Sequence, residues 1–212
     1  MSASTDIFAE PADVDVDTLR NLGPLRPMAG VWEGTVGHDE HPVAEGGEED
    51  AFVERMELQP IDPQLNGPQL FYGLRYHAHI TKPGEVETFH DQVGYWLWEP
   101  ATKSVIQMLA IPRAQVALAV GFAEPDAREF ELLAGERGIC SGPFLERAFR
   151  TVEFRIRVKT GPGDTWSYDE DTVIQVSGRA ELFHHRDRNT LVRIAAPTPN
   201  PLARRPAKPE SR

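Results

Sequence analysis

The sequence is poor in the residues and segments that several classes of protein require. Its 212 residues include 1 cysteine, Cys140, which excludes an intramolecular disulfide and a cysteine-rich metal site. No apolar run is long enough to cross a membrane as a helix, and the first ten residues lack the basic and then apolar pattern of a secretory signal. These absences predict a cytoplasmic protein with no membrane partner.

Basic residues are also scarce. There are 22 lysines and arginines against 33 aspartates and glutamates, a net charge of -11 that repels nucleic acid. The one basic cluster runs from Arg204 to Arg212 in a proline-rich tail. We therefore expect no nucleic-acid partner, and we expect the tail, residues 197–212, to be disordered.

Helical periodicity is nearly absent, and alternation of apolar and polar residues takes its place. In residues 70–80 the side chains of Leu70, Tyr72, Leu74, Tyr76, Ala78 and Ile80 share one face, opposite polar neighbours. Residues 150–159 alternate in the same way, and turn sequences at 82–85 and 161–164 separate such segments. Eight or more strands joined by short loops predict an all-β antiparallel barrel or sandwich.

This pattern divides the chain into three parts. Residues 1–22 form an N-terminal extension, in which a short helix is expected over 13–22, starting near Asp17 or Thr18. Residues 23–196 form one β domain, and residues 197–212 are the tail. Small side chains alternate along residues 115–121, which would leave room for a flat ligand if that face points inward.

The β domain opens with Gly30-Val31-Trp32-Glu33-Gly34. Alternate residues of a strand share a face, so Gly30, Trp32 and Gly34 line up together. The indole would cover one end of a barrel while the glycines allow close approach of a neighbouring backbone. Openings of this kind are typical of small β-barrels that hold one ligand.

Further motifs make the sequence similar to a known family. The segment His90-Asp91-Gln92-Val93-Gly94-Tyr95-Trp96 resembles the nitrobindins, haem-binding ten-stranded barrels that also form the C-terminal domain of a THAP-type protein. The Gly30 opening, the segment from Val116 to Leu132 and the segment from Trp166 to Asp171 agree in order with that family. The resemblance covers nearly all of residues 28–194 and implies a closed up-and-down antiparallel barrel of about ten strands, similar to lipocalins and fatty-acid-binding proteins.

The resemblance also implies a function. Family members hold b-type ferric haem through one histidine, bind nitric oxide and are credited with isomerising peroxynitrite to nitrate. Carried over to this chain, the iron ligand is His185, with His184 as the alternative, and His90 lies on the distal side. Trp32 and Trp96 would be pocket walls, and the ligand would be a small molecule in the barrel lumen.

Two departures from the family pattern affect these assignments. The third glycine of the opening is replaced by Val36, and Gly37 is displaced by one position. Between the histidine pair and the final Thr190-Leu191 there is an insertion of a few residues. His184 and His185 are adjacent in a strand, so at most one can face the lumen, and both alternatives stay open from alternation alone.

Other constellations point to different functions. His77 and His79 have the spacing of a two-histidine metal site, but the carboxylate expected four or five residues later is missing, so we place them on the outer surface. His38 and His41 lie in an acidic segment that we interpret as a solvated loop. A haem-free carrier of a fatty acid or another apolar molecule is the alternative function, and an inward Arg75, Arg150 or Arg193 would favour it.

Overall fold

The computed structural model describes residues 6–162 and 164–204, and most of these residues lie in strands. The strands of this described part belong to one 12-stranded sheet. In chain order they are β1 (Gly30–Pro42), β2 (Gly47–Pro60), β3 (Gln64–Asn66), β4 (Gln69–Thr81), β5 (Thr88–Glu99), β6 (Ser104–Ile111), β7 (Gln115–Phe122), β8 (Glu129–Gly135), β9 (Ile139–Ser141), β10 (Phe149–Thr160), β11 (Thr165–Val176) and β12 (Phe183–Ala195).

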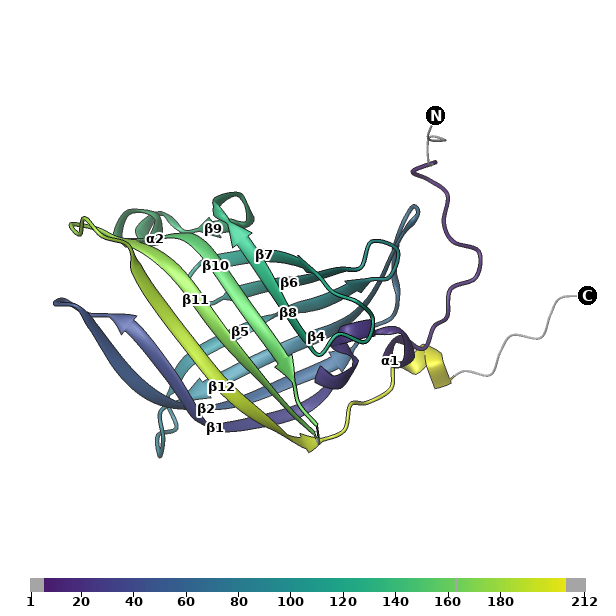
Figure 1. Cartoon of the computed structure of the whole chain (residues 1–212), viewed down its shortest axis with the longest axis horizontal. Coiled ribbons are helices and arrows are strands. Elements are labelled where there is room, and N and C mark those ends of the chain that lie inside the picture. Colours follow the sequence, from purple (N-terminus) through teal and green to yellow (C-terminus); the bar gives the residue numbers. More distant parts are fainter. Residues whose placement is uncertain (1–5, 163, 205–212) are drawn as a thin grey trace, which may run out of the picture.

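The sheet closes on itself. The path runs from β2 through β1, β12, β11, β10, β8, β7, β6 and β5 to β4, and β4 pairs back to β2 with Met56 opposite Ala78. Of the described strands, β3 and β9 lie outside this ring, which leaves ten strands in it. Figure 1 shows these strands curving into a barrel. The prediction of a closed antiparallel barrel of about ten strands is confirmed.

Strand faces follow the alternation in the sequence. On β4, Tyr72, Leu74, Tyr76 and Ala78 are between 0% and 4% exposed, because they point into the barrel. On β7 the small residues face inward, with Ala119 fully buried, whereas Val116 and Leu118 on the other face are exposed. The face of β7 that carries the small side chains is therefore the inward one, which the sequence had left open.

A β-bulge changes the alternation within β1. The pairing with β2 shifts between Gly34, which lies opposite Glu54, and Gly37, which lies opposite Phe52. One extra residue in β1 reverses the faces beyond it. Gly37 then faces inward, where a Cβ would lie 2.2 Å from the Phe52 ring. The displaced glycine of the sequence is thus the mark of the bulge.

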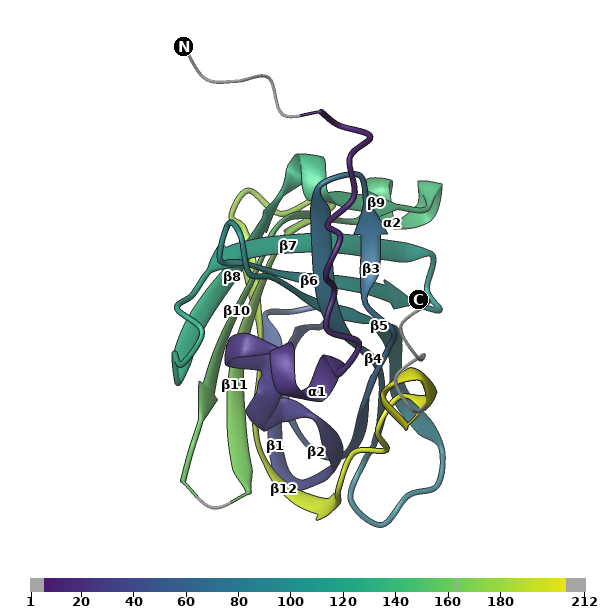
Figure 2. The ribbon, with the colours of Figure 1, turned by 90° about the vertical axis from the view of Figure 1, so that its right-hand side faces the viewer.

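The N-terminal segment closes one end of the barrel. Helix α1 (Thr18–Asn21) is capped by Asp17, whose side chain accepts from the Arg20 amide, and the 3-10 helix η1 (Gly23–Met28) follows. Figure 2 shows both across the barrel end. Leu22, Leu25 and Met28 are fully buried there. The short helix expected near Asp17 is confirmed.

The opposite end of the barrel is open. Helix α2 (Pro143–Ala148) and the short 3-10 helix η2 (Glu136–Gly138) lie at this end beside β9, far from α1 (Figure 1). Phe144 and Leu145 of α2 reach the rim of the cavity. The glycine-rich segment 135–145 therefore borders the mouth.

The last described residues lie beside the closed end. The 3-10 helix η3 (Pro201–Arg204) follows β12, and Asn200 before it donates hydrogen bonds to Val16 and Asp62. Of the tail predicted to be disordered, residues 205–212 lie outside the described residues. Among the helices of the described chain, none combines the length and the apolar character that a membrane crossing requires.

Candidate functional site

The lumen contains a cavity of about 480 Å³, within the range of small-molecule sites. It extends from the open mouth to the aromatic residues at mid-barrel. Its wall is largely apolar near the mouth and carries polar groups on one side. The side chains that line the cavity include Asp39, His41, Glu54, His90, Gln92, Trp96, Gln107, Arg113, Trp166, Tyr168, Glu170, His185 and Asp187.

The two adjacent histidines of β12 face opposite sides of the barrel wall. His185 lines the cavity. His184 points outward, and its Nδ1 lies 2.9 Å from the Asp171 carboxylate on the outer face of β11. Closure of the sheet thus separates two residues that the sequence alone could not distinguish, and it places His185 in the lumen.

Two carboxylates hold the His185 ring. Its Nε2 lies 2.7 Å from Asp39 Oδ1 and 3.1 Å from Asp187 Oδ2. Burial disfavours the imidazolium, but Asp187 and Asp39 outweigh it and raise the pKa of His185 to about 10. Burial alone would raise the pKa of Asp39, yet hydrogen bonds from its neighbours, His185 first, hold that pKa well below its usual range.

The carboxylates continue across three adjacent strands. In the strand register Asp39 of β1 lies opposite Asp187 of β12, and Asp187 lies opposite Glu170 of β11. All three side chains line the cavity. Burial, together with the charges of Asp187 and Glu54, raises the pKa of Glu170 well above its usual value, and burial raises that of Asp187 to about 6.

A fourth carboxylate, Glu54, is buried deeper in the barrel. It is 1% exposed and accepts hydrogen bonds from the Tyr168 hydroxyl at 2.8 Å and from Asn189 Nδ2 at 3.0 Å. Burial raises the pKa of Glu54 to about 7, against the opposing effect of these two donors. Gly34 makes room for this arrangement, because a Cβ there would lie 2.4 Å from Asn189 Nδ2.

His90 also lies in the cavity wall, on β5. Its Nε2 is 3.4 Å from Gln92 Oε1, and Gln92 in turn donates to the Tyr76 hydroxyl at 2.6 Å. Burial lowers the pKa of His90, while the contact with Gln92 opposes that change. Burial therefore favours the neutral form of the His90 ring, whereas the paired carboxylates favour the charged form of the His185 ring.

The two tryptophans expected as pocket walls have different positions. Trp96 is 1% exposed and lines the cavity. Trp32 does not: it is fully buried at the closed end, where its Nε1 donates to the Met28 carbonyl at 2.7 Å. The expectation that Trp32 is a pocket wall is therefore corrected. The strand that begins at Gly30 starts at the closed end of the barrel, so its first residues, Trp32 among them, lie there and not at the mouth. Trp166, beside Trp32 at 6.2 Å between ring centroids, lines the cavity instead.

Sequence reasoning missed His41 and Asp39. The segment interpreted as a solvated loop is the end of β1, and the bulge turns Asp39 and His41 into the lumen. His41 Nδ1 lies 2.5 Å from Asp39 Oδ2. The displaced Gly37 was the signal that could have revealed this change of face.

Residues weighed for other functions lie outside the lumen. His77 pairs with Asp91 at 2.8 Å on the outer face of the barrel, and His79 contacts Thr88 there. Arg75 is exposed, and Arg150 pairs with Glu136 at 2.8 Å. Arg193 binds backbone carbonyls of the closed end. None of these three arginines points into the lumen, so none supplies the carboxylate partner that would favour a fatty-acid carrier.

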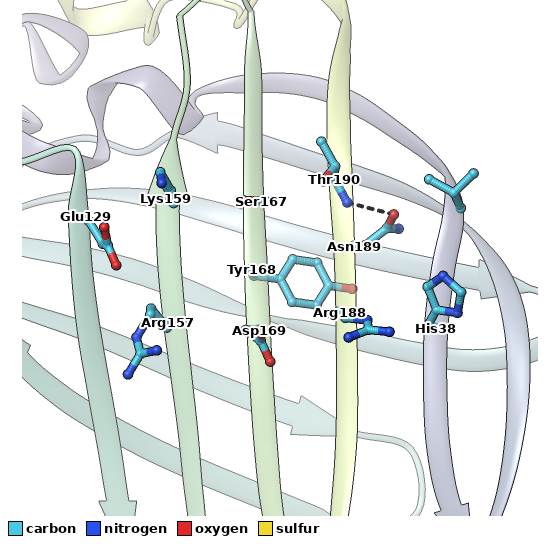
Figure 3. A pocket seen from close by; sticks show the side chains of 11 residues that line it. His38, Glu129, Arg157, Lys159, Ser167, Tyr168, Asp169, Arg188, Asn189 and Thr190 are labelled. Atoms are coloured by element: carbon cyan, nitrogen blue, oxygen red, sulfur yellow. Dashed lines mark hydrogen bonds between the residues drawn. The ribbon is translucent and has the colours of Figure 1, made fainter.

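A second hollow, of about 350 Å³, lies on the outer side of β10 to β12 beside the bulge. Figure 3 shows charges of both signs in it, among them Arg157, Asp169 and Arg188, and also His38. Arg157 donates to Glu131 at 2.7 Å. Opposite charges interleave here, as on ordinary solvated surface.

Comparisons with known proteins agree with this architecture. A family model described as "THAP4-like, heme-binding beta-barrel domain" matches residues 21–193. The crystal structure of Rv2717c from M. tuberculosis superposes with a TM-score of 0.54 at 21% identity, covering 84% of this chain and 99% of that one. That likeness shows a common fold. No curated protein matches the sequence.

Proposed function

Because the chain belongs to the THAP4-like haem-binding β-barrel family, we propose that it binds b-type haem in its lumen with His185 as the axial ligand. The observation that carries this proposal is the setting of the His185 ring. A metal-ligating histidine usually donates its second ring N–H to a carboxylate. His185 Nε2 meets Asp39 at 2.7 Å, and Nδ1 has no hydrogen-bond partner among the described residues.

Other lumen residues suit the same ligand. The indole nitrogens of Trp96 and Trp166 are buried in the cavity wall without an acceptor among the described residues. A ligand that brings acceptor oxygens would satisfy such donors. Arg113, the one arginine or lysine among the described cavity-lining residues, lies at the mouth, where it suits a propionate group. The apolar wall suits a porphyrin plane.

The activity proposed for the loaded barrel is binding of nitric oxide and isomerisation of peroxynitrite to nitrate. Bound haem would supply an iron centre that acts as Lewis acid and redox partner. The chain itself would supply His90, a neutral imidazole able to hydrogen-bond a small ligand in the cavity. Trp96 and the rim residue Phe144 would limit the access of water.

Titration of the purified protein with hemin tests the haem proposal. The wild type should give a sharp Soret band at a ratio of one haem per chain. His185→Ala should lose that band, whereas His184→Ala should keep it, since His184 lies outside the barrel. If the wild type gives no such band, or if His185→Ala keeps it, His185 is not the iron ligand.

The decay of peroxynitrite tests the activity. Haem-loaded protein should accelerate the decay and yield nitrate, while the haem-free protein should not. His90→Ala should bind haem but show a slower decay. Equal rates with loaded and haem-free protein would contradict the proposed isomerase activity.

A further inference from the structure

One side of the lumen wall is rich in carboxylates. Asp39, Asp187 and Glu170 stand side by side on three neighbouring strands, with their side chains in one cavity. Like charges directly opposite each other in a sheet are destabilising. A row of three carboxylates therefore calls for positive charge beside it.

The protein supplies little of that charge. His185 pairs with Asp39 and Asp187, and His41 pairs with Asp39. Arg113 is exposed at the mouth, where it donates to the Phe89 carbonyl at 3.0 Å. The Glu170 carboxylate accepts no hydrogen bond from any described residue. Glu170 thus stands at the end of the row without a hydrogen-bonded partner among the described residues.

The cluster has donor atoms close enough together to share one metal ion. One ligand atom each from Asp39, His185 and Asp187 lies within 4.8 Å of the other two. One imidazole and two carboxylates form a mixed nitrogen and oxygen donor set, which suits divalent transition metals such as Zn²⁺, Fe²⁺ or Mn²⁺. We infer that Asp39, His185 and Asp187 bind one divalent transition-metal ion without porphyrin, with Glu170 beside the open coordination positions.

An independent observation in the same cavity supports a ligand that brings hydrogen-bond donors. Gln107 is 2% exposed and lines the lumen, and its Oε1 has no donor among the described residues. Its Nε2 is directed to the Tyr76 hydroxyl at 3.4 Å. A buried acceptor without a donor is usually satisfied by ordered water, so the lumen has a place for water of the kind that a hydrated metal ion brings into the cavity.

The metal site does not depend on the haem proposal. Both use the His185 imidazole, so occupation by a divalent ion and ligation of haem iron should exclude each other. Excess Zn²⁺ should therefore weaken hemin binding. Direct metal binding is measured on haem-free protein, so that failure of one proposal leaves the other testable.

Calorimetric titration with Zn²⁺, and the visible absorption of bound Co²⁺, test the site on the full chain. The wild type should bind one ion, and Co²⁺ should show the intense bands of a low-symmetry site. Asp187→Asn should weaken binding at least tenfold. Asp39→Asn should do the same and provides a second variant if one does not fold, as judged by circular dichroism.

Two matched controls distinguish this site from exposed histidines. His184→Ala removes the adjacent ring on the outer face, and His77→Ala removes another exposed ring; both should bind Zn²⁺ as the wild type does. Absence of stoichiometric binding in the wild type would overturn the inference. So would equal affinities in the wild type and both lumen variants, or loss of binding in the controls.

Discussion

The two ends of the barrel use the same strands for opposite purposes. At the closed end, Leu22, Leu25, Met28 and Trp32 are fully buried and leave no described cavity among them. Toward the mouth, the same barrel opens into a cavity of about 480 Å³. Carboxylates and imidazoles crowd one side of its wall. Close apolar packing is thus concentrated at the closed end, and ionisable side chains are concentrated toward the mouth.

This difference follows from what each end can bury. Apolar side chains gain stability by packing without voids, and the N-terminal helices supply a lid that is itself apolar. Buried carboxylates such as Glu54 reduce stability unless they are protonated or paired. The closed end therefore stabilises the fold, whereas the buried carboxylates near the mouth destabilise it. Mutations at the two ends should change the free energy of unfolding by different amounts.

The largest effect should come from removing the centre of the closed end. Trp32→Ala removes a ring that packs edge-on against Trp166 and whose Nε1 donates to the Met28 carbonyl. The Cζ of Arg193 lies 4.1 Å from the centroid of the same ring. We expect a loss of about 3 to 5 kcal/mol in the free energy of unfolding, measured in urea. Phe144→Ala at the mouth, where Phe144 is 65% exposed, should change it by less than about 0.5 kcal/mol. Similar losses in both variants would contradict the comparison.

The next largest effect should come from the buried carboxyl group of Glu54. Glu54 has a pKa raised from 4.5 to about 7 in the folded protein. Between these values the native state keeps a proton that the unfolded state has released. The free energy of unfolding should therefore fall as pH rises through this window, by about 3 kcal/mol from this group.

Urea unfolding at pH 4.5 and pH 7.5 measures this dependence. Glu54→Gln should reduce the dependence by the contribution of this group, while Glu170 and Asp187, whose pKa values are also raised, keep theirs. The variant should be more stable than the wild type at pH 7.5, because Tyr168 can donate to the new amide oxygen as it does to Glu54. Glu57→Gln, on the outer face of the same strand, is the matched control and should behave as the wild type. An unchanged pH dependence in Glu54→Gln would show that this carboxyl is ionised in the fold.

The smallest effect should come from Arg193, whose hydrogen bonds connect β12 to the N-terminal segment at the closed end. Arg193 donates to the carbonyls of Ala29 and Pro27 and to Asp164 at the same time as it covers Trp32. Lysine cannot reproduce this planar fork. Arg193→Lys should lower the free energy of unfolding by about 1 to 2 kcal/mol. Asp164→Asn, at a 73% exposed side chain, should have a smaller effect; equal effects would assign the role to the ion pair alone.

Several features of the site could be predicted from single segments. The alternation along β4 indicated which face points inward, and the family resemblance of the segment from His90 to Trp96 implied that both residues line a pocket, where the structure has them. These predictions succeeded because the period of a strand is local. Where β1 contains a bulge, the same reasoning failed, and Asp39 and His41 were assigned to a loop. Trp32 was misplaced since a strand pattern does not say which end of a barrel is capped.

The amino-acid sequence by itself determined the β class, the inner and outer faces of the regular strands and the family. Only the tertiary structure decided that His185 rather than His184 enters the lumen, and that Asp39, Asp187 and Glu170 form one row. The reason is physical. Alternation is a property of one strand, whereas register, bulges and closure depend on hydrogen bonds between strands far apart in the chain. Residues separated by more than a hundred positions, such as Asp39 and His185 at 2.7 Å, meet only after the barrel closes.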